Sequence, residues 1–320
     1  MANGEEQTAN MKDVLVIYYT QTGQQKEILD NLLAPLEADS EVKLTFHRIQ
    51  PVSDYPFPWD GHSFFDAFPE SFLRIPCPLT AVEEDVLNKE YDLIILGYQV
   101  WYLSPSIPFN SFLKSEAAIR LLNGKPVITV INCRNMWVMA QEKVKKSLHE
   151  IGANHVGNVV LADRHPNHVS VITIVHWMMK GRKNSYLGLF PKPGVSDKDI
   201  AESSRFGPSI ITHLKNNDYA TLQAALVGLG AVVVKPVLVF TDKRANTLFA
   251  KWAKLIRSKG LPGEAARRPW LKAFNYYLLF AIWVLAPVVS LLFLILHLPF
   301  LSLIRKEKRY YQSVNFKTPR

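Results

Sequence analysis

Between Ala273 and Ile304 the chain contains 32 residues without a single Asp, Glu, Lys or Arg. About 20 consecutive apolar residues are enough for a helix to cross the hydrocarbon core of a bilayer. We therefore predict a transmembrane or re-entrant segment at residues 273–304, either a hairpin that bends near Pro287 or a single tilted span. A buried helix of a soluble core is the alternative. Both flanks are basic, so their charges indicate no orientation.

Charge divides the chain into two parts. Residues 1–225 carry 21 basic and 25 acidic side chains, whereas residues 226–320 carry 16 basic and 3 acidic ones. A basic tail suits either nucleic acid or an anionic membrane surface. Because the basic residues bracket an apolar stretch and form no isolated patch, we expect a membrane and no nucleic acid as the partner. Residues 246–259 have one apolar helical face, which suits a helix lying on a membrane or packed on the body.

Composition excludes several classes of protein. Hydrophobic residues make up 48% of the chain and charged residues 20%, which is typical of a packed core and excludes intrinsic disorder. Only two cysteines, Cys77 and Cys133, are present, and this excludes a disulfide scaffold or a cysteine-rich zinc module. We expect no metal site. The first ten residues are polar, so no secretory signal is expected there, and the predicted location is the cytoplasmic face of the inner membrane.

The body of the chain, residues 12–218, alternates between two kinds of apolar pattern. Short apolar runs typical of buried strands occupy residues 13–19, 42–49, 91–98, 126–131 and 156–161. Helical patterns occupy residues 25–36, 107–122, 136–151 and 196–215. Strands that alternate with helices predict parallel βαβ units covered on both faces. The prediction is an α/β fold, a doubly wound five-stranded sheet of the flavodoxin type with strand order 2-1-3-4-5 and ligands at the carboxyl ends of the strands.

The remaining segments have distinct compositions. Residues 1–11 are predicted to be disordered. The insertion at residues 51–78 is rich in proline and aromatic residues and cannot be one regular helix, so we expect it to cover the body as a lid or wall. Residues 219–272 are predicted to be a basic amphipathic helical linker, and residues 305–320 a basic tail. The whole C-terminal part is expected to be a membrane-associated helical tail.

A polar turn follows the first predicted strand and leads into a helix. It reads Thr20-Gln21-Thr22-Gly23-Gln24-Gln25. Two hydroxyls, a flexible glycine and the N–H groups at the positive end of a helix form a combination that binds a phosphate monoester. The spacing matches neither a Walker loop nor G-x-G-x-x-G. An ordinary strand-to-helix turn is the alternative.

Two further strand ends carry candidate cofactor-binding residues. The third strand ends in Tyr98, Gln99, Trp101 and Tyr102, and the fourth ends in Asn132, Cys133, Arg134 and Asn135. Aromatic rings at a strand end suit stacking on a flat, electron-rich ring. The carboxyl ends of parallel strands meet at one edge of the sheet, so we expect a phosphate cradle, an aromatic wall and a polar rim to lie together there.

These loops resemble those of the flavodoxin family, with T-x-T-G after the first strand and G-Y-x-x-W-Y after the third. The resemblance implies FMN as the cofactor. Gln25 departs from the family pattern, which usually has a third hydroxyl residue there; Lys26 could contribute charge to the phosphate. The motifs YYTQTGQ, FFDAFPES, LGYQVWYLSPSIP, CRNMWVMAQEKVKK and VVLADR look more specifically like the dialkylresorcinol condensing enzymes, which accompany a ketosynthase in making resorcinol lipids, including the flexirubin pigments.

The family name says "condensing", but the residues point to another step. Condensation needs an activated cysteine with histidine partners, and neither cysteine has that context. With the ketosynthase as the condensing partner, the resemblance implies an aromatase that oxidises a lipophilic 2,5-dialkylcyclohexane-1,3-dione to a 2,5-dialkylresorcinol. Arg134 and Asn135 are candidates for stabilising enolate charge, and His165 or His168 is the candidate base, although both histidines could be ordinary loop residues.

Two other functions remain open at this point. One is a membrane-associated NAD(P)H:quinone reductase or another flavodoxin-like electron-transfer protein. The other is a non-enzymatic membrane scaffold for the ketosynthase. By analogy with other flavodoxin-like enzymes, a homodimer is also allowed.

Overall fold

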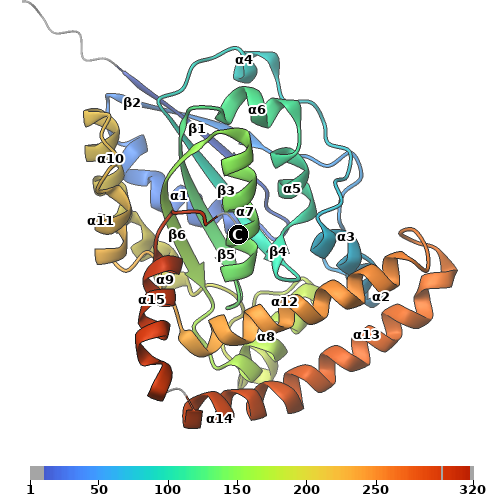
Figure 1. Ribbon diagram of the computed structural model, residues 1–320. Helices are drawn as coiled ribbons and strands as arrows, with labels where there is room; N and C mark the ends of the chain where they lie inside the picture. Colours follow the sequence, from blue (N-terminus) through green and yellow to red (C-terminus); the bar gives the residue numbers. More distant parts are fainter. Residues whose placement is uncertain (1–10, 297, 318–320) are drawn as a thin grey trace, which may run out of the picture.

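The computed structural model describes residues 11–296 and 298–317. Its centre is a parallel sheet whose long strands lie in the order β2-β1-β3-β5-β6 (Figure 1). A two-residue strand, β4 (Ser104–Pro105), pairs antiparallel with the end of β3. Without β4, this order is the 2-1-3-4-5 arrangement of doubly wound sheets. The predicted flavodoxin-like α/β fold is confirmed.

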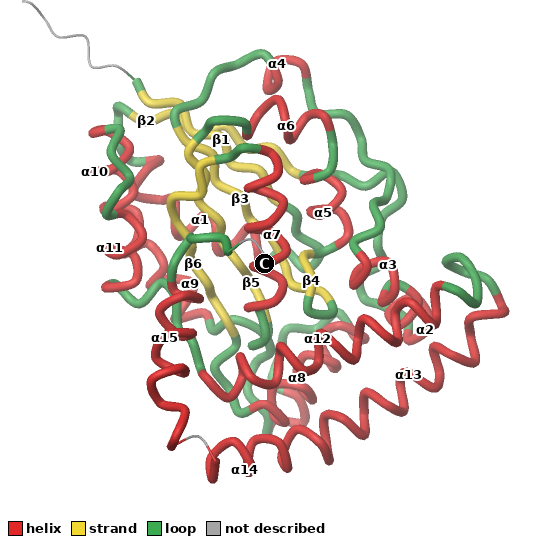
Figure 2. The backbone as a smooth tube through the Cα atoms, in the orientation of Figure 1, coloured by secondary structure: helices red, strands yellow, loops and turns green. Residues whose placement is uncertain are grey.

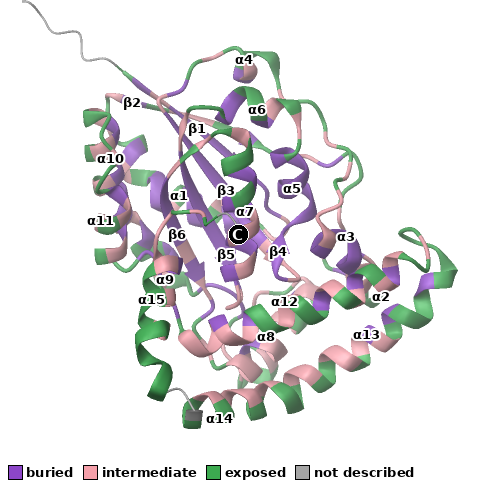
Figure 3. Cartoon of the chain, viewed as in Figure 1, coloured by how far each residue is buried: buried purple, intermediate pink, exposed green. Residues whose placement is uncertain are grey.

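The five long strands are β1 (Lys12–Tyr18), β2 (Val42–Arg48), β3 (Leu93–Trp101), β5 (Pro126–Cys133) and β6 (Asn154–Ala162). Of these, β1, β3 and β5 are almost completely buried, β6 is buried along its middle, and the edge strand β2 is partly exposed (Figure 3). A strand covered on both faces is expected to be a continuous apolar run, and β1, β3 and β5 are such runs. The register pairs Gln99 with Asn132 and Cys133 with Ala162, so the polar ends of neighbouring strands meet at one edge.

Helices cover both faces of the sheet (Figure 2). One face carries α1 (Gln24–Glu37), α9 (Asp197–Ala201) and α10 (Gly207–Asn216), and the other carries α5 (Ile107–Leu113), α6 (Glu116–Leu122) and α7 (Val138–Ile151). The helix predicted at residues 107–122 is two helices, because Ser115 caps a new helix by accepting a hydrogen bond from the N–H of Ala118.

Helix α11 (Leu222–Gly228) packs against β6, and its Leu222 and Leu226 are fully buried in the main core. The body therefore continues beyond residue 218, where the sequence analysis expected a linker to begin. The insertion at residues 51–78 contains the short helices α2 (Gly61–Asp66) and α3 (Phe68–Leu73), and α4 (Glu84–Leu87) follows it.

A second hydrophobic core joins the insertion to the C-terminal helices. It lies between α3, the turn after β3, α12 (Pro236–Arg257) and α13 (Arg268–Phe280). Its buried members are Phe68, Phe72, Leu103, Phe249, Ala253, Ile256, Leu271 and Phe274. The apolar face of α12 is thus packed on the body, and this decides between the two arrangements left open for residues 246–259.

The apolar segment is one continuous helix, Ala265–Ile295, and no part of its most apolar window is buried in the protein. Among the described residues it is the one helix long and apolar enough to cross a membrane. It comprises a 3₁₀ turn at Ala265–Arg267, α13, a π-helical turn at Ala281–Leu285 and α14 (Ala286–Leu296) as far as Ile295.

The chain does not reverse at Pro287, so the predicted hairpin bend there is wrong. Proline lacks an N–H, and its ring clashes with the carbonyl four residues earlier, here that of Trp283. The π-helical turn lies at this position and changes the hydrogen-bond register, which lets the helix continue.

The chain then returns to the body through α15 (Leu301–Gln312). Tyr311 is buried in the main core, and the Nε2 of Gln223 donates to the carbonyl of Gln312 at 2.7 Å. The residues predicted as a basic tail are therefore docked on the sheet domain as far as the structure describes them. The predicted disorder of residues 1–11 falls almost wholly outside the described part of the chain; Met11 is exposed.

Candidate functional site

The turn between β1 and α1 has the geometry of a phosphate cradle. Gly23 precedes the helix with a φ of 86°, a conformation that glycine adopts without strain. The hydroxyl of Thr20 accepts the N–H of Gly23 at 3.0 Å, and that of Thr22 accepts the N–H of Gln24 at 3.4 Å. Among the described residues no acceptor faces the N–H groups of Thr22 and Gln25. These donors and the N–H of Lys26, which also has no acceptor among the described residues, remain free at the positive end of a 14-residue helix.

The glutamine side chains of this turn serve the fold. Gln24 is buried and bonds both the N–H and the carbonyl of Val195, at 3.2 and 3.1 Å. Gln25 is fully buried and donates to the carbonyl of Val130 at 3.2 Å, while its Oε1 has no partner. For Gln25, only the backbone N–H is left to contact a phosphate, because its side chain turns into the core.

The cation that contacts this turn differs from the one that the sequence suggested. Lys26 forms an ion pair with Asp30 and lies over the ring of Phe46, so it does not serve the turn. Arg48, at the end of β2, instead donates to the carbonyl of Thr20 at 3.4 Å. The only feature of the sequence that could have pointed to Arg48 is its position at the end of a predicted strand.

A tight hairpin between β3 and β4 presents the aromatic wall. Tyr102 and Leu103 are its two central residues, with φ values of 48° and 59°. Positive φ costs a non-glycine residue on the order of 1 kcal/mol or more. Contacts on both sides hold the turn: the Tyr102 hydroxyl donates to the carbonyl of Phe64, and the Nζ of Lys143 donates to the carbonyl of Leu103 at 3.0 Å.

Trp101 is held at the edge of the hairpin by other rings. It makes edge-to-face contacts with Tyr19, Tyr55 and Trp59, with ring centroids 5.8, 5.2 and 5.5 Å away. The indole N–H of Trp59 in turn donates to Gln21 at 3.2 Å, so the insertion is tied to the phosphate turn. The insertion therefore forms a wall of the site, as predicted.

Tyr98 does not belong to this wall. Its side chain is fully buried. Its ring stacks on that of Phe109, with centroids 4.7 Å apart, and its hydroxyl donates to the Oε1 of Gln141 at 2.6 Å. Successive side chains of a strand point to opposite faces, and Tyr98 points into the helix layer. The prediction that it binds the cofactor is wrong for its side chain.

The polar rim comes from the ends of β3 and β5. Gln99 accepts the N–H of Gln21 at 3.3 Å, and Asn132 is its neighbour in the sheet. Cys133 is buried, and burial raises the pKa of its thiol well above the usual range. A protonated, buried thiol is a poor nucleophile, and this agrees with a site that performs no cysteine-dependent condensation.

Arg134 brings positive charge to the same edge. Its guanidinium donates to the side-chain oxygen of Asn167 at 2.8 Å and to the backbone carbonyl of Asn167 at 3.3 Å. Burial lowers the pKa of Arg134 to about 10, while the carboxylate of Asp163 opposes the shift. Arg134 therefore stays cationic at neutral pH.

These elements surround one cavity of about 230 Å³. The predicted residues Gln21, Thr22, Gln24, Gln99, Trp101, Tyr102, Asn132, Cys133 and Arg134 all line it. Its outer wall is a helix that the sequence analysis did not assign to the site, α8 (Asn167–Lys180), through Ile174, Val175, Trp177, Met178 and Met179. The apolar run at residues 169–179 was the signal for this wall.

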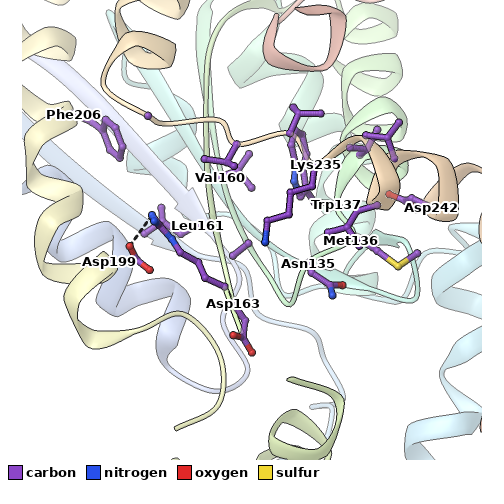
Figure 4. A pocket seen from close by; sticks show the side chains of 18 of the residues that line it. Asn135, Met136, Trp137, Val160, Leu161, Asp163, Asp199, Phe206, Lys235 and Asp242 are labelled. Atoms are coloured by element: carbon purple, nitrogen blue, oxygen red, sulfur yellow. Dashed lines mark ion pairs between the residues drawn. The ribbon is translucent and has the colours of Figure 1, made fainter. Parts of the chain in front are cut away.

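Figure 4 shows a second cavity, of about 200 Å³. Residues 132–134 line the first cavity, and the residues that follow them, 135–138, line the second. Asn135 and Asp163 line this second cavity, and Lys235 points into it. Asn135 donates to Asn167 at 2.8 Å, so Asn167 connects it to Arg134 in the first cavity. At the far end, burial raises the pKa of Asp242 to about 6, although the N–H of Met139 donates to its carboxylate at 3.1 Å.

The two histidines proposed as the base lie outside both cavities. His165 contacts the carboxylate of Asp163 through its Nδ1 at 2.7 Å. His168 contacts the carbonyl of Ile282 through its Nε2 at 3.1 Å and packs on Trp283, with ring centroids 4.9 Å apart. The structure therefore does not bring either histidine to the cavity, and the described lining contains neither a histidine nor a carboxylate.

The donor set of the first cavity fits FMN. Free backbone N–H groups at the start of α1 suit the phosphate, Trp101 and Tyr102 suit a flat ring, and Gln99 and Asn132 offer amides to the polar edge of that ring. No group of three or more His, Cys, Asp or Glu side chains suited to a metal ion occurs within the described ranges.

Comparison with known proteins shows a similarity in fold to solved structures and nothing further. No protein-family model matches the chain, and no curated protein matches it. Solved structures do match. A putative flavoprotein from Bacteroides eggerthii is 19% identical, with a TM-score of 0.37 over 48% of this chain and 89% of that one. An archaeal flavodoxin is 16% identical, with a TM-score of 0.36 over 63% and 99%. A flavoprotein from Lactobacillus acidophilus, solved in complex with FMN, is 19% identical, with a TM-score of 0.36 over 47% and 93%.

Proposed function

We propose that the protein is an FMN-dependent oxidoreductase that converts a lipophilic 2,5-dialkylcyclohexane-1,3-dione into a 2,5-dialkylresorcinol at the cytoplasmic face of the inner membrane, as the partner of a ketosynthase. One observation carries the proposal. The phosphate turn and the aromatic hairpin open into a single cavity whose outer wall, α8, contacts the apolar C-terminal helix. The resemblance to dialkylresorcinol condensing enzymes supplies the substrate.

The reaction removes two hydrogens from the ring, one as a hydride and one as a proton. FMN, when bound, supplies the two-electron acceptor. A 1,3-dione is acidic because its enolate is delocalised over two oxygens, so the chain needs to stabilise the anion more than to remove its proton. Arg134, which lines the cavity and stays cationic, is placed for that role. This division of labour agrees with a described lining that holds no histidine.

Of the other three residues predicted to be catalytic, Asn135 takes an indirect role and the two histidines take none. Asn135 holds Asn167, which in turn holds the guanidinium of Arg134. His165 shares Asp163 with Ser170, whose hydroxyl donates to the same carboxylate at 2.6 Å. We assign Asn135 and Asn167 as positioning residues and leave His165 and His168 out of the chemistry.

The test is an anaerobic titration of the purified full chain in mild detergent. Bleaching of a flavin absorption band by a dialkylcyclohexanedione, with resorcinol as the product, is the expected result. A flavin absorption band that the dione leaves unchanged and NAD(P)H bleaches would indicate the quinone reductase. The same cavity and apolar helix also suit that function. A chain that binds no flavin after reconstitution with FMN would leave only the membrane scaffold.

The residue role is tested in the same titration. Arg134→Met is expected to slow bleaching by the dione at least about tenfold, while Arg134→Lys keeps the charge and loses less. A matched control is Arg164→Met. Arg164 is exposed and pairs with Asp199 on the rim of the second cavity. Equal rates in both Met variants would contradict the role of Arg134.

A further inference from the structure

Both ends of the apolar helix are fixed to the same domain. At its start, the guanidinium of Arg267 is fully buried and pairs with Glu70 and Asp66, each at 2.9 Å. Two helical turns later, the ring of Phe274 stacks on that of Phe68, with ring centroids 3.8 Å apart. These contacts bind the N-terminal flank to the insertion.

The C-terminal flank returns to the sheet. Beyond the apolar helix, Tyr311 is buried in the main core, and the Tyr310 hydroxyl donates to Glu142 on α7 at 2.6 Å. The carbonyl of Val314 contacts the Nδ1 of His155 on β6 at 3.3 Å. Both flanks of the segment therefore pack on one sheet domain.

This arrangement is incompatible with a span. A helix rises about 1.5 Å per residue, so the stretch from Phe274 to Ile295 covers roughly the 30 Å thickness of the hydrocarbon core. A helix crossing the bilayer would place its flanks on opposite sides. The flanks could not then reach the same folded domain.

The body also contacts the helix along its length. His168 contacts the carbonyl of Ile282 and the ring of Trp283. The ring centroids of Phe240 on α12 and Phe293 are 5.4 Å apart. In Figure 1 the helix runs along the base of the molecule beside α12, and it does not project away from it. Its outward side carries about half-exposed apolar side chains, among them Tyr276, Leu279, Phe280, Val284, Val288 and Leu291.

Helix α8 continues this apolar surface. Its buried residues include Ser170 and Thr173, whereas Val175 is 47% exposed and is also one of the residues that line the first cavity. In the loop that follows α8, Leu187 and Leu189 are 69% and 85% exposed. An apolar wall exposed in this way is unfavourable in water and favourable in lipid.

The charges around this surface suit anionic lipid. Lys180 and Arg182 at the end of α8 are exposed, and no described acidic group pairs with them. Exposed basic residues also lie at both ends of the apolar helix: Lys254 and Lys259 precede it, Arg268 and Lys272 are in its first turns, and Lys306 and Arg309 follow it. Basic residues around an apolar strip are the signature of a helix lying in the membrane interface.

We infer that the protein is monotopic: the helix Ala265–Ile295 lies along one leaflet of an anionic membrane, and α8 with its following loop forms the second part of the same membrane-facing surface, so that the first cavity opens toward lipid. The membrane contact stands on the fold alone. Entry of a lipophilic substrate through that opening rests on the proposed function.

The orientation is tested with single cysteines in the full chain. Ser258→Cys and Lys306→Cys place thiols at exposed positions on the two flanks, in a Cys77→Ser background that keeps buried Cys133. A membrane-impermeant maleimide is expected to label both variants in inside-out vesicles and neither in right-side-out vesicles. Labelling of the two variants from opposite sides would overturn the monotopic arrangement.

Depth is tested with bimane on Phe280→Cys, Leu291→Cys and Leu189→Cys, using vesicles of phosphatidylcholine and phosphatidylglycerol with a nitroxide lipid near the headgroup. Ile119→Cys is the control, because Ile119 is 53% exposed on α6, in the layer that covers the sheet. Quenching at 280, 291 and 189 with none at 119 is expected. Quenching at 280 and 291 alone would overturn the role of the α8 loop. No quenching at any position would overturn the membrane surface, whereas bleaching by the dione would still support the reaction.

Discussion

The two hydrophobic cores are built by different means. Most of the main core comes from strands and the helices next to them in the sequence, although α9, α10 and Tyr311 also pack into it. The second core joins α3 to α12 and α13, which lie well over 150 residues further along the chain. The first core is fixed by the alternation of strands and helices, and the second by particular rings and one buried cation. The second core should therefore be sensitive to single substitutions.

The cores meet at the hairpin after β3. Trp101 faces the cavity, whereas Leu103, two residues later, belongs to the second core. The substitutions below ask whether damage to one core reaches the other through this turn. The first three are ordered by the size of the expected effect, and a pH dependence follows them.

Arg267→Met should have the largest effect. Removing the guanidinium leaves the carboxylates of Glu70 and Asp66 without their buried partner, and breaking such a cluster costs about 3–5 kcal/mol of the free energy of unfolding. Urea unfolding in mild detergent measures the loss. Arg268→Met, at an exposed neighbour, is the control and should stay within about 0.5 kcal/mol of the wild type. Similar losses in both variants would contradict a buried ionic lock.

Phe274→Ala should come next. Its ring contacts Phe68, Phe249 and Trp252, and deleting a buried ring costs about 3 kcal/mol. We expect faster proteolysis between α12 and α13 while the sheet domain keeps its resistance. Phe280→Ala removes a ring that is 52% exposed and should leave the digestion pattern unchanged. Loss of the whole fold in one cooperative step would show that the two cores do not act separately.

Thr22→Asp changes the phosphate turn, which belongs to the sheet domain and its main core. A carboxylate in the cradle repels a phosphate, so the Kd for FMN should rise at least about tenfold. The Kd for riboflavin, which lacks the phosphate, should hardly change. Thr212→Asp on α10 is the charge-matched control. Equal weakening of both flavins would show that the turn does not bind the phosphate.

Lys143 comes last, because its effect appears only as a pH dependence. Burial beneath the hairpin lowers its pKa from 10.5 to about 7. Between these values the unfolded chain binds one proton more than the folded chain, so the stability of the folded chain should rise with pH above about 7. Urea midpoints from pH 7 to 9.5 should rise less in Lys143→Met than in the wild type. Parallel curves would mean that Lys143 does not titrate in this range.

The sequence predicted the sheet well, because its signals are local. Apolar runs and helical spacing located β1, α1, β2 and β5 to within one or two residues. The second core has no such signal, since the contact of Arg267 with Glu70 joins residues nearly 200 positions apart and depends on how the C-terminal helices return.

The site was predicted in outline for the same reason. Strand ends converge on one edge in any sheet of this topology, which brought Thr22, Gln99 and Trp101 to one cavity. Which way a side chain turns depends on its packing partners, and Tyr98 and Gln25 turned into the core. The apolar run at residues 169–179 follows the last predicted strand and was assigned to no element. It could have been recognised as the helix α8 that forms the wall of the site.

The return of α15 has a practical consequence for making this protein. Truncation before residue 265 would remove the apolar helix, as is often done to obtain a soluble fragment. The cut would also delete Arg267, Phe274 and Tyr311, which complete the two cores. The sheet domain would be left with buried carboxylates and open hydrophobic surface, so the shortened product should aggregate. Substituting the outward-facing apolar residues of the helix with polar ones would keep the architecture intact.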